Sequence, residues 1–309
     1  MFQKKKLLAL ILALMMVFSL AACGGAEETP KPAAEAPAAE STVVVDAATQ
    51  FLAELPGIMI PAPDYLAKLT AGETPFTLDI RSAEDYAKGH IAGSINAPWG
   101  TQVLADNLAN IPMDQPVYVY CYTGQTAGQA VGLMKIAGYD VYSIRFGYNL
   151  GLSKEVGNEA FMSTEPTDFD TTVGTEIAPE FVAMISDYYK AMETTTNKNN
   201  KIASKDLDAL LAAEDDSIFV LDIRKAEDFA KGHIPTAINI PFAPGMQEQF
   251  ADLPKDKTIV INCYTGQTAG QATAAMRVLG YDVISLHSGF GTPDTGDSGW
   301  SNEGFEVVQ

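Results

Sequence analysis

The chain has 309 residues, enough for two domains of about 100 to 150 residues that each bury a hydrophobic core. Hydrophobic residues make up 47%, which excludes a wholly disordered protein, and the formal net charge of −19 gives a nucleic-acid partner almost no electrostatic support. The three cysteines and three histidines follow no Cys-x-x-Cys or His-x-x-x-His spacing, so neither a disulfide scaffold nor a metal site is predicted. No cofactor is expected either.

The first residues have the pattern of a secretory signal. Lysines in Met1–Lys6 precede the apolar run Leu7–Leu20, which is short for a membrane span. The sequence Leu20-Ala21-Ala22-Cys23-Gly24 resembles a bacterial lipobox. This resemblance implies a signal peptide over residues 1–22, lipidation of Cys23 and an extracytoplasmic protein whose membrane contact is the lipid anchor alone. An uncleaved apolar N-terminus with an incidental cysteine is the alternative.

A spacer is predicted next, over residues 23–42. Gly24–Ser41 consists of Ala, Glu, Pro, Gly, Thr, Ser and one Lys, without a large apolar residue. Such a segment cannot bury enough surface to offset the entropy of ordering it. It would hold the folded part away from the membrane.

An internal repeat organises the remaining chain. Asp79–Ile91 recurs with few changes as Asp222–Ile234, and Cys121–Ala130 recurs unchanged as Cys263–Ala272. A repeat this long indicates duplicated domains rather than a solenoid.

We place the two domains at residues 43–165 and 166–309. Helices are predicted around Ala47–Leu55 and Pro179–Met192. We interpret each as an N-terminal extension of its own domain.

Strands and helices alternate within each copy, which predicts α/β domains with a mainly parallel sheet and helices on both faces. A short helix over Ser82–Lys88, with Ser82 as N-cap, Asp85 at the capping-box position and Gly89 as the stop, lies between two strands. A helix containing Ala127–Ala137 follows the cysteine and ends at Gly138. The predicted strands are Phe76–Leu78, Val117–Tyr120 and Val141–Ile144 in the first copy, and Ile218–Leu221, Thr258–Ile261 and Val283–Leu286 in the second.

Cys121 and Cys263 each end a predicted strand and open a glycine-containing loop into a helix. Main-chain N–H groups of such a loop, together with the positive end of the helix dipole, favour a thiolate and can bind an anion. A strand-end cysteine can also be a small buried hydrophobe. The unchanged segment around both cysteines favours a nucleophile.

These motifs resemble the rhodanese family of sulfurtransferases: Asp-Ile-Arg, Gly-His-Ile, Ile-Asn-x-Pro, and Cys-x-x-Gly at a strand end. The resemblance implies two tandem rhodanese-like domains in which Cys121 and Cys263 take sulfane sulfur from thiosulfate or a similar donor and pass it to a thiol or cyanide through a persulfide. A small sulfur-containing anion or thiol is then the partner. The implied substrate-binding residues are Tyr122, Thr123, Gly124, Gln125 and Thr126, with Tyr264, Thr265, Gly266, Gln267 and Thr268. The supporting residues are Asp79, Arg81, His90, Asp222, Arg224 and His233, which we interpret as mainly structural.

One departure from the family concerns the donor. Many thiosulfate-using rhodaneses carry arginine at the fifth position after the cysteine, where this chain has Thr126 and Thr268. The threonine hydroxyl can donate a hydrogen bond to a dianionic donor such as thiosulfate, but it carries no positive charge to balance that donor. Arg145 and the equivalent His287 are candidates for the rim of the sites.

Other functions stay open at this point. A cysteine phosphatase or arsenate reductase would need Cys-x5-Arg, and Ala127 and Ala269 stand there instead. A tethered, non-catalytic sulfur carrier or anion-binding module would need the same cysteines. A redox role would require Cys121 and Cys263 to face each other.

Overall fold

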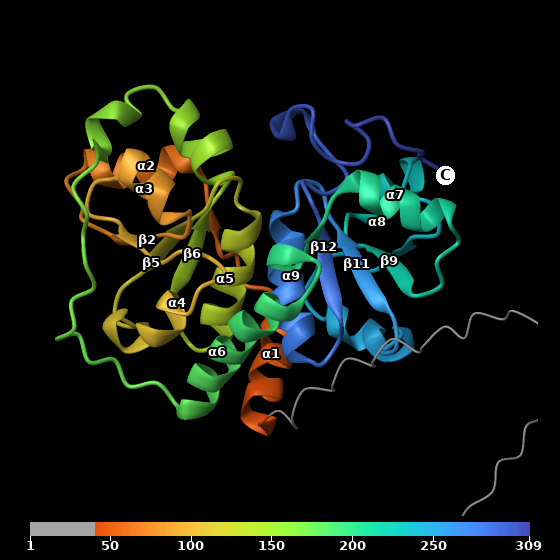
Figure 1. Cartoon of the computed structure of the whole chain (residues 1–309), viewed down its shortest axis with the longest axis horizontal. Helices are drawn as coiled ribbons and strands as arrows, with labels where there is room; N and C mark the ends of the chain where they lie inside the picture. Colours follow the sequence, from red (N-terminus) through yellow and green to blue (C-terminus); the bar gives the residue numbers. More distant parts are fainter. Residues whose placement is uncertain (1–40) are drawn as a thin grey trace, which may run out of the picture. The chain divides into compact units, whose positions relative to one another are not determined.

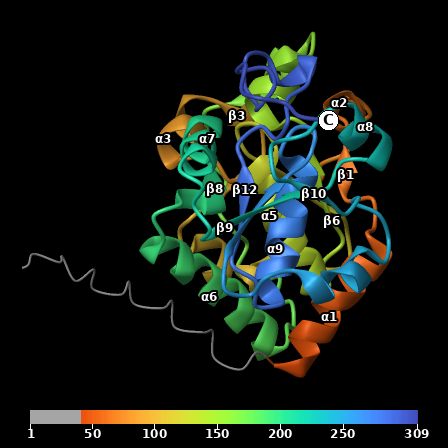
Figure 2. The same cartoon turned by 90° about the vertical axis from the view of Figure 1, so that its right-hand side faces the viewer.

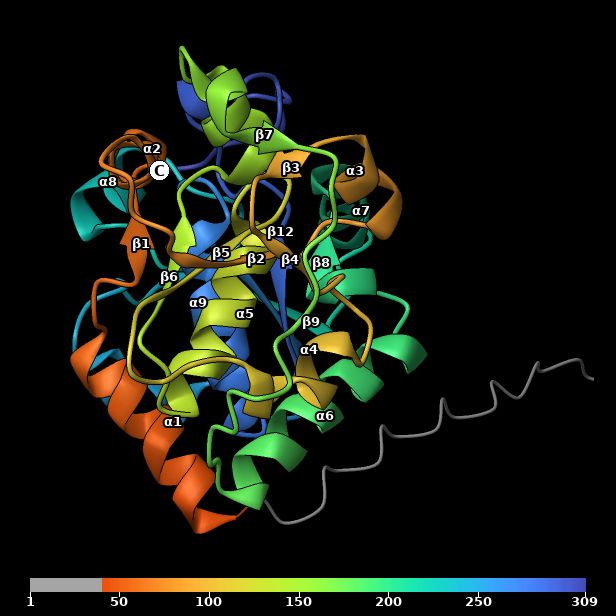
Figure 3. The same ribbon diagram turned by 90° about the vertical axis from the view of Figure 1, so that its left-hand side faces the viewer.

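Each half of the chain is built on a parallel sheet. The computed structural model describes residues 41–309, so the predicted signal peptide, Cys23 and most of the spacer lie outside the described residues. The first sheet has five strands in the order β1-β6-β5-β2-β4 and the second has five in the order β10-β9-β11-β12-β8, every pairing being parallel. Figures 2 and 3 show the second and first sheets in turn. The strands are β1 (Met59–Ile60), β2 (Phe76–Asp79), β4 (Ile95–Asn96), β5 (Val117–Tyr120), β6 (Val141–Ile144), β8 (Lys201–Ile202), β9 (Ile218–Asp222), β10 (Ile238–Asn239), β11 (Thr258–Asn262) and β12 (Val283–Leu286).

Alternate residues of the strands bury against helices on opposite faces, because successive side chains of a strand point to opposite sides of the sheet. Tyr118 packs in a cluster with α2, whereas Val119 belongs to the core that contains α5. In the second half, Val260 packs with α7 and Ile261 with α9. Helices on both faces of parallel sheets confirm the predicted fold class. The helices are α1 (Thr42–Glu54), α2 (Ala62–Thr70), α3 (Ala83–Lys88), α4 (Val103–Asp106), α5 (Gln125–Ile136), α6 (Pro179–Thr194), α7 (Ser204–Ala212), α8 (Ala226–Lys231) and α9 (Gln267–Val278).

Shorter elements complete the chain. The antiparallel pair of β3 (His90–Ile91) and β7 (Met162–Ser163) closes the first half. The short helical turns are η1 (Leu108–Asn110), η2 (Gly147–Gly151), η3 (Leu152–Lys154), η4 (Asn158–Phe161), η5 (Lys198–Asn200), η6 (Met246–Asp252) and η7 (Pro293–Thr295).

The N-terminus of α3 differs from the predicted capping box. Ser82 Oγ accepts the N–H of Asp85 at 3.2 Å, as expected of an N-cap. The reciprocal bond is made by another residue, because the N–H of Ser82 donates to the hydroxyl of Tyr122 at 3.1 Å. The loop after Cys121 is thereby joined to α3.

The prediction that each of the helices α1 and α6 extends its own domain is incomplete for α1, which packs against both α5 and α9, and wrong for α6, which packs against α4 and α5 of the first half. In α6, Tyr188 donates its hydroxyl to Gln129 Oε1 of α5 at 2.6 Å, and Tyr189 packs edge-on against Trp99 with ring centroids 5.0 Å apart. In the opposite direction, the carbonyl of Leu52 in α1 accepts the N–H of Gly245 at 3.2 Å. The repeat shows that each copy carries such a helix, but an amphipathic helix does not specify which sheet it covers.

Helices α5 and α9 pack against each other at the centre of the described structure (Figure 1). Glycines allow this approach: a Cβ on Gly128 would collide with the main-chain oxygen of Gln267, and a Cβ on Gly270 with that of Gln125. One hydrophobic core consequently contains residues of both halves, including both strand-end cysteines. The two halves are joined by close main-chain contact between α5 and α9 and by the side chains of this shared core.

The described helices are short by membrane standards. Within residues 41–309, no helix combines the length and the apolar content that crossing a bilayer requires.

We predict that Gly128→Ala lowers the free energy of unfolding by about 1 to 3 kcal/mol, the usual range for overpacking a core. The loss is expected although alanine favours helix more than glycine does, by about 1 kcal/mol. Gly57→Ala is the control, since a Cβ there meets nothing within 4 Å. Urea unfolding monitored by circular dichroism measures both variants, and an unchanged Gly128→Ala would show that the α5–α9 contact relaxes at no cost.

Candidate functional site

Cys121 and Cys263 occupy equivalent places at the ends of β5 and β11, next to the first turns of α5 and α9. The Sγ of Cys121 accepts the N–H of Gly124 at 3.1 Å and that of Ala127 at 3.4 Å. The distances at Cys263 are the same, from Gly266 and Ala269. Both thiols are free, and each cysteine is 2% exposed. Two amide donors and a helix N-terminus on one sulfur stabilise negative charge there.

A second loop braces each cysteine loop from behind. The carbonyl of Cys121 accepts the N–H of Tyr148 at 2.7 Å, and that of Cys263 accepts the N–H of Phe290 at 2.7 Å. A Cβ on Gly147 would collide with the carbonyl of Cys121, and one on Gly289 with that of Cys263. Sequence reasoning missed these two glycines, although both stand at matching repeat positions.

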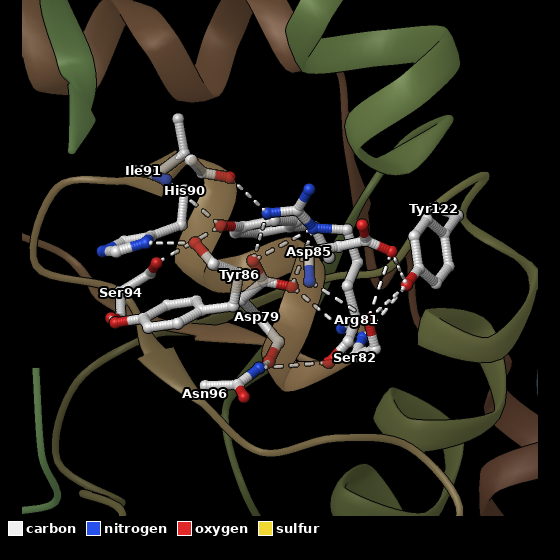
Figure 4. Close-up of polar contacts among 12 residues, drawn as sticks. Asp79, Arg81, Ser82, Asp85, Tyr86, His90, Ile91, Ser94, Asn96 and Tyr122 are labelled. Atoms are coloured by element: carbon white, nitrogen blue, oxygen red, sulfur yellow. Dashed lines mark hydrogen bonds and ion pairs between the residues drawn. The ribbon is translucent and has the colours of Figure 1, made fainter. Parts of the chain in front are cut away.

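The Asp79–Arg81 and Asp222–Arg224 pairs are buried ion pairs. Asp79 is 0% exposed and Arg81 is 3% exposed, and the guanidinium meets the carboxylate at 2.6 to 3.1 Å (Figure 4). Arg81 also donates to the carbonyl of Gly89 at 2.7 Å and lies over the ring of Tyr148. Arg224 repeats the arrangement with Asp222. Through Nε and Nη2, Arg81 fixes the loop before α3.

His90 and His233 also lie against main-chain groups. Both ring nitrogens of His90 face carbonyl oxygens, that of Tyr86 at 2.8 Å and that of Glu165 at 2.9 Å. His233 Nδ1 lies 3.1 Å from the carbonyl of Phe229. These contacts do not direct either ring towards a cysteine. They are typical of a histidine that holds the surrounding main chain in position.

The tyrosine after each cysteine binds the short helix of its own half. Tyr122 donates its hydroxyl to Asp85 Oδ2 at 2.6 Å (Figure 4). Tyr264 binds Asp228 in the same way at 2.5 Å. The hydrogen bond from Tyr122, followed by those from Lys88 and Ser82, lowers the pKa of Asp85 to about 2. Tyr122 also borders a polar pocket of about 290 Å³. The other lining residues are Arg81, Asp85, Lys88, Gly89, Tyr148 and Asn149.

The side chains of Gln125 and Gln267 reach across to the other half, and their predicted part in substrate binding stays a prediction. Gln125 Nε2 donates to Ser285 Oγ at 2.8 Å and to the carbonyl of Leu286 at 2.9 Å. Gln267 Oε1 accepts the N–H of Phe146 at 2.8 Å. The repeated segment therefore carries contacts between the halves as well as the sulfur site, a connection that spacing along the chain does not indicate.

The remaining loop residues bring no charge. Thr126 and Thr268 lie in the first turns of α5 and α9, and Thr123 and Thr265 precede the loop glycines. Of the rim candidates, Arg145 is exposed with its guanidinium over the ring of Phe146, and His287 is half-buried. Burial, and then the charge of Lys201, lower the pKa of His287. Lys201 was not predicted from the sequence as a site residue.

No metal site emerges from the part of the chain that the structure describes, where no group of three or more His, Cys, Asp or Glu residues is placed to hold an ion.

Comparison with known proteins matches both halves of the chain to one family. The family model of the rhodanese-like domain matches twice, at residues 62–153 and 203–291. A sulfurtransferase of Allochromatium vinosum is 31% identical over 110 residues, covering 35% of this chain and 94% of the relative. Thiosulfate sulfurtransferase GlpE of Pseudomonas entomophila is 33% identical over 100 residues, covering 32% of this chain and 89% of the relative. A crystallised protein of Bacillus halodurans is 27% identical, covering 40% of this chain and 85% of that one, with a TM-score of 0.32.

Each half is a parallel α/β domain with a cysteine at a strand end, whose sulfur accepts amides of the following loop and helix. The chain belongs to the rhodanese-like family and carries that domain twice. Its relatives support a role in sulfur transfer. The domain boundaries at 43–165 and 166–309 stay a prediction.

We predict that Tyr122→Phe raises the pKa of Asp85 from about 2 towards its ordinary value of 3.8, because the largest hydrogen bond to the carboxylate is lost. Carboxyl-carbon NMR titration measures this. A lowered carboxyl pKa stabilises the folded state above the unfolded pKa, and the contribution disappears as the pH falls through the folded pKa. The variant should therefore lose less stability between pH 4 and pH 2 than the parent does.

Tyr264→Phe is the matched control. The pKa of Asp228 is lowered first by Lys231 and only then by Tyr264, so its shift should be smaller. Equal shifts at the two carboxylates would contradict the assignment of Tyr122 as the main partner of Asp85.

Proposed function

We propose that the protein is a sulfurtransferase that moves sulfane sulfur from thiosulfate or a similar small anionic donor to a thiol or cyanide, through persulfides on Cys121 and Cys263. The observation that carries the proposal is the pair of free, buried thiols, each receiving two main-chain N–H groups at a helix N-terminus. The sulfurtransferase relatives support the same reaction class.

The reaction has two half-steps. The cysteine thiolate attacks the outer sulfur of thiosulfate, a new S–S bond forms, the S–S bond of the donor breaks, and sulfite leaves with the electron pair. An acceptor thiolate or cyanide then attacks the outer persulfide sulfur, and the cysteine thiolate leaves. The amides that bind Sγ stabilise the negative charge at both stages, and no strong base is needed.

Burial of the thiols restricts the donor. A cysteine that is 2% exposed can be reached by a compact anion more readily than by a protein thiol. The loop itself supplies amides and hydroxyls but no arginine, so charge on the donor must be matched from elsewhere in the structure.

We expect Cys121→Ser and Cys263→Ser each to leave partial thiosulfate:cyanide sulfurtransferase activity, and the double variant to have none. Peptide mass spectrometry of the reduced protein after incubation with thiosulfate should show one added sulfur on each cysteine. Complete loss from one single substitution would contradict two working sites. Loading of both cysteines without turnover would indicate a sulfur carrier rather than a catalyst.

We also propose that Cys23 is lipidated and tethers the protein on the outer face of a bacterial membrane. The lipobox-like sequence before it supports this. Expression in a bacterial host should yield a membrane-associated form whose N-terminal peptide begins at a lipid-modified Cys23, and Cys23→Ala should release the protein from the membrane fraction. An unmodified Cys23 peptide beginning at Met1 would refute the anchor.

A further inference from the structure

Lys201 begins β8 at the edge of the second sheet and faces the contact between the halves. Its Cα partner in the neighbouring strand β12 is Ser285. Paired residues of adjacent strands point to the same face of a sheet. Ser285 Oγ accepts the side-chain amide of Gln125, the first residue of α5, so Lys201 lies on the face that meets the N-terminus of this helix.

The residues before Lys201 are fastened to the same helix. The carbonyl of Asn199 accepts Gln129 Nε2 at 2.9 Å, and Asn200 Nδ2 donates to Gln129 Oε1 at 3.4 Å. Asn200 is 1% exposed, and its carbonyl also accepts Ser285 Oγ at 3.3 Å. The start of β8 is therefore held against α5, the helix whose first turn lies on Cys121.

Among the residues that the structure describes, the positive charge of Lys201 has no carboxylate partner. Within residues 41–309 Lys201 makes no ion pair, whereas Arg81 is paired with Asp79. Burial lowers the pKa of Lys201, and the charge of Cys121 acts on that pKa in the opposite direction. The cysteine loop itself, from Cys121 to Thr126, contains no cation.

Building on the sulfur-transfer function proposed above, we propose that Lys201 binds the negative charge of the sulfur donor at Cys121, so that a side chain of the second half completes the site of the first. The half-buried ammonium of Lys201 supplies a positive charge that the cysteine loop lacks, and a charge-assisted bond to an anion is stronger than one from a hydroxyl.

The second site lacks this cation. The repeat position equivalent to Lys201 is Met59, which pairs with Ser143 just as Lys201 pairs with Ser285. The two cysteine sulfurs thus accept equivalent main-chain N–H groups, but the opposite half contributes a lysine at the first site and a methionine at the second. Cys121 is the site for an anionic donor, and Cys263 binds such a donor more weakly.

The test uses single-cysteine proteins. In the Cys263→Ser background, Lys201→Met should raise the KM for thiosulfate about tenfold with little change in kcat, the effect expected from loss of one charge-assisted bond of about 1.4 kcal/mol. Lys201→Arg should restore most of the affinity. Lys205→Met, which removes an exposed lysine of α7, is the charge-matched control and should leave the KM unchanged. In the Cys121→Ser background, Met59→Lys should lower the KM at Cys263.

A binding measurement separates this inference from the catalytic proposal. Sulfite should protect Cys121 against the neutral reagent iodoacetamide. Because one charge-assisted bond is lost, Lys201→Met should raise the sulfite concentration needed for half-maximal protection about tenfold. If neither cysteine accepts sulfur but Lys201→Met still abolishes protection, the sulfur-transfer proposal fails and the anion site stands. Equal protection, or an equal KM, in Lys201→Met and its parent would overturn the role of Lys201.

Discussion

The structure depends on the approach of α5 and α9, which meet backbone against backbone at Gly128 and Gly270. Such contact is possible only where no side chain stands between two helices, and it brings the first turns of both helices together. Those first turns are the ones that bind the sulfurs of Cys121 and Cys263. The same helix contact consequently determines both the packing of the core and the positions of the two cysteine sites.

This constraint explains why the Cys121–Ala130 segment recurs unchanged while its surroundings differ. Part of the segment supplies amides to Sγ, and part forms the contact between halves through Gly128 and the side chain of Gln125. A substitution in it affects both a site and the core. The reading of this segment from sequence as a substrate loop alone was incomplete, because Gln125 binds Ser285 and Leu286.

Features encoded by local pattern were predictable, and features that arise between the halves were not. The strands around each cysteine and the helix after it follow from short apolar runs and glycine stops, and they are confirmed. The crossing of α1 and α6 was missed because an apolar helix face is compatible with either sheet. Lys201 was missed because its relation to Cys121 is created by tertiary packing, although its alignment with Met59 carried a signal: a charge at one repeat position and none at the other.

The α5–α9 contact is self-complementary, since residues of each copy meet the equivalent residues of the other. Self-complementary surfaces of this kind are typical of symmetric homodimers. The chain has in effect the interface of a dimer whose two subunits are one polypeptide. Identical subunits must carry the same residue at equivalent positions, whereas covalent joining removes that restriction. Lysine at position 201 and methionine at the equivalent position 59 are a difference that a homodimer could not have acquired.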